Sequence, residues 1–157
     1  MPVRGRERAA LATIFLLVLL CGCAVHRNPT LKSGAEPGWT EFQSYCTSCH
    51  QSDGRGVGEA PPLAGSPWVA GPESRLIKIV LHGVRGRMEV AGRTYDLEMP
   101  GFGQVLSDES IASLLSFVRK RFGAASDSVT PDSVRRIRDA NRDRTDYWNV
   151  SELLEEP

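Results

Sequence analysis

The chain has 157 residues, of which 41% are hydrophobic and 24% are charged, and its 19 basic and 19 acidic side chains give a formal net charge of zero. This balance argues against a nucleic-acid-binding protein, which would need an excess of Lys and Arg. It also provides no strong field that would steer one particular charged partner toward the protein.

The first 22 residues have the pattern of an export signal. Arg4, Arg6 and Arg8 precede an apolar run over residues 9–20, and that run is short against the roughly 20 apolar residues that span a membrane. Without these 22 residues the chain loses three arginines and one glutamate, so that 16 basic and 18 acidic side chains remain. The mature chain is therefore predicted to be an exported protein of nearly balanced charge.

Cys23 lies where the apolar run meets a polar segment. The stretch Leu20-Cys21-Gly22-Cys23 resembles the bacterial lipoprotein box, which implies that Cys23 becomes the lipidated first residue of the mature chain. An ordinary secretory signal and a single membrane anchor are the alternatives. Several acyl chains exceed the single chain that gives only marginal membrane binding. We therefore expect the polar residues 23–37 to tether the protein to the periplasmic side of a bacterial membrane, and Ala24 favours the outer membrane.

The most informative motif is Cys46-Thr47-Ser48-Cys49-His50. Two cysteines three positions apart, followed at once by histidine, form the attachment pattern of a c-type haem. Each thiol can add across one vinyl group of the porphyrin, and the imidazole of His50 then faces the iron. The motif predicts one covalently bound haem c, attached through Cys46 and Cys49.

The residues around this motif weigh against two other interpretations. Trp39, Phe42, Tyr45 and Cys49 follow one another at helical spacing, whereas a thioredoxin-like cysteine pair normally follows a buried strand. A zinc site would need further ligands at short spacing, and the other two histidines are isolated in the sequence. Haem attachment is therefore the preferred interpretation.

Residues 38–123 are predicted to form a core domain that is mostly helical. Residues 72–83 and 107–123 place apolar side chains at helical spacing. Pro72 favours the start of the first of these helices, and Ser107 is a good N-cap for the second. A glycine follows each of them, as is common where helices end.

The rest of the core domain is expected to be irregular. Residues 51–65 are rich in Gly and Pro and predict a loop. Residues 88–90 and 93–95 flank a turn and could pair as a short hairpin. Because fewer than about 90 residues form only a marginal core, a buried haem would add much of the apolar contact, and we expect the apoprotein to fold poorly.

Three side chains are candidates for the second axial position of the iron. Met99 precedes Pro100 in a loop just before the last core helix, where the proline would stiffen the approach of the thioether. Met88 lies in the expected hairpin, and His82 lies near a helix end, where it would interact with the helix dipole. Met99 is the preferred ligand, and a His/Met pair both raises the potential of the iron and saturates it.

The motifs together resemble those of a class I c-type cytochrome. The resemblance covers residues 38–123 and rests on four features of this sequence: the haem motif, Gly56, Pro61-Pro62-Leu63 and Met99-Pro100-Gly101-Phe102. It implies an all-α cytochrome c fold with three to five helices around one haem, in which the first and last helices cross beside it.

The resemblance also assigns roles around the haem. It implies that the carbonyl of Pro62 accepts a hydrogen bond from the imidazole of His50, which would orient the ring. Trp68 and Tyr95 have a polar tip on an apolar body and are candidates for contacts with the haem propionates, although a role as core aromatics is an equal alternative.

Residues 124–157 extend beyond the pattern of a small cytochrome. Thr130-Pro131-Asp132 predicts the start of a further helix, which would carry a thin apolar stripe beside several arginines. This helical extension either covers the core domain or docks onto a redox partner.

The leading functional prediction is a membrane-tethered electron carrier without catalytic residues, cycling one iron between Fe(III) and Fe(II). It would pass electrons between a periplasmic dehydrogenase or membrane complex and an acceptor such as a terminal oxidase or another cytochrome. The alternative is a haem enzyme or sensor, such as a peroxidase or gas-binding module, with an open or displaceable sixth position. An enzyme would need a proton-handling residue on that side of the iron.

Overall fold

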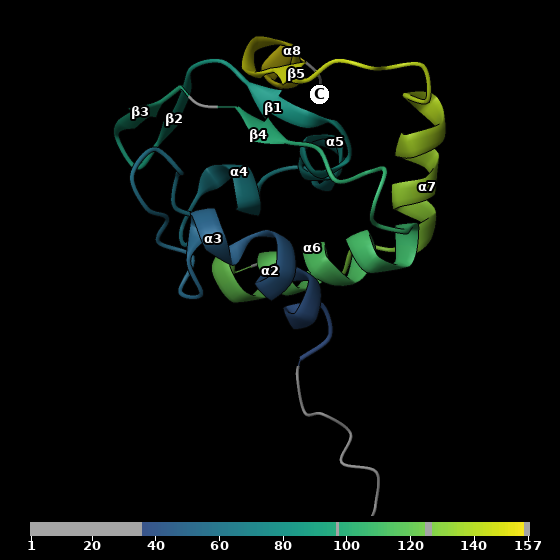
Figure 1. Ribbon diagram of the computed structural model, residues 1–157, viewed down its shortest axis with the longest axis horizontal. Coiled ribbons are helices and arrows are strands. Elements are labelled where there is room, and N and C mark those ends of the chain that lie inside the picture. The colour runs from purple at the N-terminus through teal and green to yellow at the C-terminus, as the bar shows by residue number, and fades with distance from the viewer. Residues whose placement is uncertain (1–35, 97, 125–126, 156–157) are drawn as a thin grey trace, which may run out of the picture. The chain divides into compact units, whose positions relative to one another are not determined.

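The structure is a computed structural model that describes residues 36–96, 98–124 and 127–155. The export signal, the lipidation site at Cys23 and nearly all of the tether lie outside these residues. The described part is rich in helix, as predicted, and also contains short strands (Figure 1). Its helices are α2 (Trp39–Tyr45), α3 (Thr47–His50), α4 (Pro67–Ala70), α5 (Glu73–His82), α6 (Asp108–Phe122), α7 (Pro131–Ala140) and α8 (Val150–Glu155).

Helix α2 crosses α6 at close range, which agrees with the arrangement implied by the family resemblance. Gly38 precedes α2 with a φ of 86°, and a Cβ atom there would collide with the backbone of Ser113 in α6. The ring of Phe42 lies 5.4 Å from the rings of both Phe117 and Phe122, between centroids. Glycine therefore permits the close crossing, and an aromatic cluster stabilises it.

The two long core helices begin and end close to the predicted residues. Ser107 is the N-cap of α6, and its Oγ accepts a hydrogen bond from the Ser110 amide at 3.2 Å. Helix α5 begins after Pro72. The short α4 was not predicted, although Ser66 caps it and Pro67 occupies its first turn, a recognisable start signal.

The strands form two small sheets. The hairpin of β2 (Met88–Val90) and β3 (Arg93–Tyr95) is antiparallel and pairs as expected. A second sheet has the order β4-β1-β5, with β4 (Met99–Pro100) antiparallel and β5 (Trp148–Asn149) parallel to β1 (Gly83–Arg85). The helix-rich cytochrome c fold is thus as expected, and this small sheet adds to it three strands of two or three residues that were not predicted.

The extension packs against the core domain. Thr130 caps α7 as predicted, and Val129 and Val134 belong to the main hydrophobic core. Trp148, Val150 and Leu153 belong to a second hydrophobic cluster that also contains Ile79 of α5 and Val84 of β1. In Figure 1, α7 lies beside the start of α6, and β5 and α8 lie next to β1. Among the described residues, no helix is both long and apolar enough to cross a membrane.

Candidate haem site

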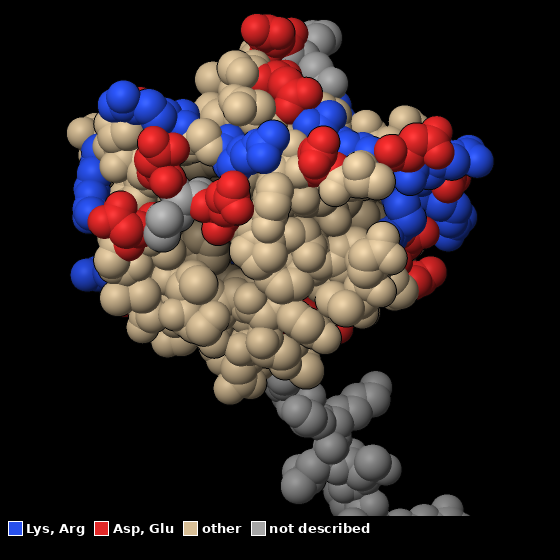
Figure 2. All heavy atoms as spheres, turned by 45° about the horizontal axis from the view of Figure 1, so that its top comes forward, with Lys and Arg blue, Asp and Glu red and all other residues tan. Residues whose placement is uncertain are grey.

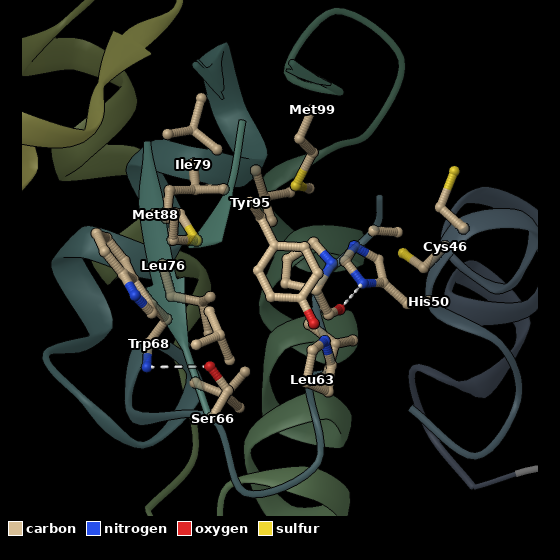
Figure 3. Close-up of a pocket in the computed structure, with 18 of the residues that line it drawn as sticks. Cys46, His50, Leu63, Ser66, Trp68, Leu76, Ile79, Met88, Tyr95 and Met99 are labelled. Carbon is tan, nitrogen blue, oxygen red and sulfur yellow. Dashed lines mark hydrogen bonds between the residues drawn. The ribbon is translucent and has the colours of Figure 1, made fainter. Parts of the chain in front are cut away.

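An apolar cavity lies between the helix that ends at His50 and the strands that carry the methionines (Figure 3). One wall comes from the haem motif and the loop that follows it. The opposite wall comes from β2, β3 and β4, and helices α5 and α6 close the remaining sides. The aliphatic residues of these two helices that line the cavity are Leu76, Ile79, Val80, Leu114, Leu115 and Val118.

Both cysteines of the haem motif line this cavity and are free thiols. Cys46 is half-buried at the junction of α2 and α3, whereas Cys49 is exposed. Burial, together with the neighbouring Cys49, raises the pKa of the Cys46 thiol to about 12. Before haem attachment the Cys46 sulfur would therefore be a protonated thiol at neutral pH, and both cysteines line the cavity.

The His50 ring is oriented by the loop that follows it. Its Nδ1 lies 2.9 Å from the carbonyl oxygen of Pro61, to which Nδ1–H donates. The expected acceptor was Pro62, so this is a correction of one residue. Gly56 explains the register, because it has a φ of 74°, its amide donates to the His50 carbonyl, and a Cβ atom there would collide with the Ala60–Pro61 backbone.

This hydrogen bond also determines which nitrogen of His50 is free. The side chain is only 8% exposed, and burial lowers its pKa, an effect that the Pro61 hydrogen bond partly opposes. The ring is therefore neutral, with its proton on Nδ1. The lone pair of Nε2 remains available, and this side of the ring faces the cavity (Figure 3).

The structure separates the three candidates for the second axial position. Met99 lies in β4, extends into the cavity and packs against both hydrophobic clusters. Met88 also lines the cavity but lies nearer Trp68 and Ile79 (Figure 3). His82 is not among the lining residues and instead lies near Arg144 in the segment after α7.

Trp68 and Tyr95 both line the cavity and are largely buried, with 9% and 8% of their surfaces exposed. The indole Nε1–H of Trp68 donates to the Glu89 carbonyl at 3.3 Å, so this aromatic also holds the hairpin in place. Arg93 stacks over the Tyr95 ring at 5.0 Å from its centroid. Both aromatic side chains thus form part of the cavity wall, and their contact with the haem propionates stays a prediction.

These side chains fit a covalently attached haem. Two thiols at one edge, a neutral imidazole with a free nitrogen facing inward and thioethers on the far wall form the donor set of a c-type haem. The remaining lining is almost entirely apolar, as a porphyrin requires. The zinc alternative gains no support, because the described residues contain no cluster of three or more His, Cys, Asp or Glu that could hold a metal ion.

The surface carries charges of both signs. Figure 2 shows acidic and basic side chains close together in the upper part of this view and over α7 at its right, beside a broad face without charged side chains. Large exposed hydrophobic residues include Tyr45, Val57 and Val105. Tyr45 packs against Phe102, with 5.6 Å between the ring centroids, and Phe102 lies two residues beyond the Met99 strand.

The chain is similar in sequence to several known proteins. Residues 33–118 match the family described as cytochrome c oxidase, cbb3-type, subunit III. Cytochrome c-552 of Thermus thermophilus is 34% identical over 120 residues, which cover 72% of this chain and 73% of that protein. The fructose dehydrogenase cytochrome subunit of Gluconobacter japonicus is 34% identical over 120 residues. The cytochrome c subunit of the quinone alcohol dehydrogenase of Komagataeibacter europaeus is 35% identical over 108 residues.

The last two proteins are much longer than the matched region. The alignment covers 24% of the fructose dehydrogenase subunit and 22% of the alcohol dehydrogenase subunit, against 71% and 66% of this chain. The similarity to these subunits is thus a similarity to one part of each of them.

Proposed function

Because this chain belongs to the family of c-type cytochrome domains that includes subunit III of cbb3-type cytochrome c oxidase, we propose that it is a lipid-anchored electron carrier on the periplasmic side of a bacterial membrane. The family makes it an electron-transfer cytochrome with covalently bound haem c. The anchor at Cys23, the axial pair of His50 and Met99 and the redox partners are the finer parts of the proposal.

The observation that carries the proposal is that His50, from the haem-motif helix, and Met99, from β4, both extend into the same apolar cavity (Figure 3). When bound, the haem supplies a one-electron Fe(III)/Fe(II) couple. The chain positions both ligands, and its aliphatic walls exclude water from the site. A haem held by both His50 and Met99 would leave a substrate no free coordination site, which would favour electron transfer over oxygen or peroxide chemistry.

The partners are proposed from the relatives. Two of the similar proteins are named as cytochrome subunits of dehydrogenases, and the matched family is that of an oxidase subunit. We infer a periplasmic dehydrogenase or another cytochrome as donor and a terminal oxidase as acceptor. A lipid anchor would confine the search to a surface and raise the effective concentration of partners.

The test of axial ligation is the visible spectrum of the oxidised holoprotein. A thioether ligand gives a weak charge-transfer band in the red, and we expect this band in the unaltered protein. Met99→Ala should abolish the band and allow carbon monoxide to bind the reduced form rapidly, because the sixth position is then open. The matched control is Met88→Leu, which alters the other methionine that lines the cavity and should leave the band in place.

Three outcomes would contradict the proposal. If the unaltered protein lacks the band and binds carbon monoxide rapidly, the site is open and a haem enzyme or sensor is the better description. If Met88→Leu removes the band and Met99→Ala does not, the ligand is Met88. If neither substitution changes an existing band, the band does not report a methionine ligand, and the pair of His50 and Met99 is wrong.

A further inference from the structure

Arg138 connects the C-terminal extension to the loop that follows Met99. It lies on α7, far along the chain from the haem motif, and its side chain is 29% exposed. Its Nη1 donates to the Gly103 carbonyl at 2.5 Å, and its Nη2 donates to the Leu106 carbonyl at 3.0 Å. Its Nε donates to Asp108 Oδ1 at 2.8 Å, at the start of α6. One guanidinium therefore forms hydrogen bonds to two carbonyls of the loop, those of Gly103 and Leu106, and to Asp108 in the helix that follows.

The other side of this loop lies on α5 and β1. The amide of Phe102 donates to the Val80 carbonyl at 2.8 Å, and that of Gly103 donates to the Leu81 carbonyl at 3.0 Å. A Cβ atom at Gly103 would lie 2.7 Å from the Leu81 oxygen and 3.3 Å from the Arg138 guanidinium. The loop backbone is thus held between α5 and Arg138, with no room for a side chain at that position.

This geometry bears directly on Met99. Met99 pairs with Val84 in the middle of β1, so one side of its position is determined by the sheet. The chain that leaves it reaches α6 only through the loop that Arg138 holds. A planar guanidinium with several donors in a fixed fork suits two backbone carbonyls and a carboxylate at once, and charged donors give stronger hydrogen bonds than neutral ones.

We propose that Arg138 is a positioning residue for Met99: it holds the loop that follows Met99 against α5 and so resists displacement of the thioether by other ligands. This inference rests on the proposed function, because it takes Met99 as the axial ligand. It gives the extension a role at the haem site in addition to covering apolar surface.

The test is the binding of imidazole to the oxidised holoprotein. Binding is measured by the loss of the red charge-transfer band. The apparent dissociation constant varies inversely with the fraction of molecules whose loop is open. For Arg138→Gln we expect imidazole to bind about tenfold more tightly, since that fraction rises about tenfold. Arg138→Lys keeps the charge but not the fork and should give an intermediate increase.

Two arginines provide matched controls. Arg135 lies on the same helix, 3.5 Å from Asp108, but among the described residues it has no hydrogen bond to a loop carbonyl. Arg119 donates to the Val69 and Gly71 carbonyls at 3.2 and 2.7 Å. Its substitution therefore also removes hydrogen bonds from an arginine to two backbone carbonyls, but at α4 and not at the loop after Met99. Arg135→Gln and Arg119→Gln should leave the affinity for imidazole unchanged, even though Arg119→Gln lowers the melting temperature.

A second measurement does not depend on the iron. Amide exchange at Phe102 and Gly103 should become faster in Arg138→Gln and Arg138→Lys than in Arg119→Gln. The proposal is overturned if both Arg138 variants bind imidazole as the unaltered protein does, or if Arg119→Gln increases binding equally. It also fails if the unaltered protein has no charge-transfer band, but that result contradicts the proposed axial ligation itself and is thereby distinguishable.

Discussion

At the scale of single residues, three glycines determine how the loop after the haem motif returns to His50. Gly54, Gly56 and Gly58 all have left-handed backbone conformations, with φ of 71°, 74° and 58°. Gly54 packs against the Phe122 ring, and Gly56 packs against the Ala60–Pro61 backbone. Gly58 has no atom near its missing Cβ. Any side chain at Gly54 or Gly56 would therefore collide with its neighbours and also strain the backbone, whereas at Gly58 it would only strain the backbone.

Gly56→Ala should destabilise the holoprotein by about 1–3 kcal/mol, because an L-residue is strained at this φ and its Cβ pushes against Pro61. The displaced carbonyl would weaken the hydrogen bond to His50 Nδ1. A weaker hydrogen bond makes the imidazole a poorer donor to the oxidised iron, so we also expect the reduction potential to rise. Thermal melting and potentiometric titration measure the two effects.

Gly58→Ala is the control for the backbone strain alone. It has a similar φ but no collision, so it should cost about 1–2 kcal/mol and leave the reduction potential unchanged. If Gly58→Ala shifts the potential as much as Gly56→Ala does, the position of the Pro61 carbonyl is not the cause.

At the scale of elements, the structure assigns the extension to the core. Helix α7 packs against α5 and α6, and β5 adds a parallel strand to β1 through the pairs Val84–Trp148 and Arg85–Asn149. The predicted helix start at Thr130 could be found from local residue preferences. Strand β5 could not be found in this way, because its partner β1 is distant in the sequence and two residues are too few to show an alternating pattern.

A chain that stops after Gly123 should melt more than about 10 °C lower than the full chain. The truncation exposes the core contacts of Val129, Val134, Trp148 and Leu153, and burial of each such side chain contributes about 1.5–3 kcal/mol. The melting temperature of the holoprotein is the measurement. Arg136→Gln, on the exposed face of α7, should melt within about 2 °C of the full chain, because most surface substitutions change stability by less than about 0.5 kcal/mol.

The same truncation distinguishes covering from docking. If the truncated protein melts like the full chain but exchanges electrons more slowly with a partner oxidase or dehydrogenase, the extension serves as a docking element and the packing contributes little. A lower melting temperature with an unchanged rate supports the role of a cover.

At the scale of the whole molecule, the haem should be required for the folded state. Helices α5 and α6 direct aliphatic side chains from Leu76, Val80, Leu114 and Val118 into the cavity, and without haem these face water or a void. We expect the apoprotein to lose its near-ultraviolet circular dichroism and to melt without a cooperative transition, whereas the holoprotein keeps both. A cooperative apoprotein transition near that of the holoprotein would show that the protein packs without its cofactor.

Membrane association is predicted to depend on Cys23. Cys23→Ser should move the protein from the membrane fraction to the soluble periplasmic fraction, since a lipid-modified cysteine needs the thiol. Cys21→Ser tests the alternative cysteine and should leave the protein in the membrane fraction. If Cys23→Ser stays with the membrane while haem attachment is normal, the N-terminal segment itself is the anchor.

The features that could be predicted from the amino-acid sequence are those that depend on neighbouring residues. They are the haem motif, the caps at Ser107 and Thr130 and the hairpin of β2 and β3, each of which has a local physical signal. The features that join distant segments could be found only in the folded structure. They are the acceptor for His50 at Pro61, the β4-β1-β5 sheet and the bonds from Arg138 to Gly103 and Leu106. Backbone carbonyls look alike in a sequence, and which one a side chain reaches depends on how loops and helices pack in space.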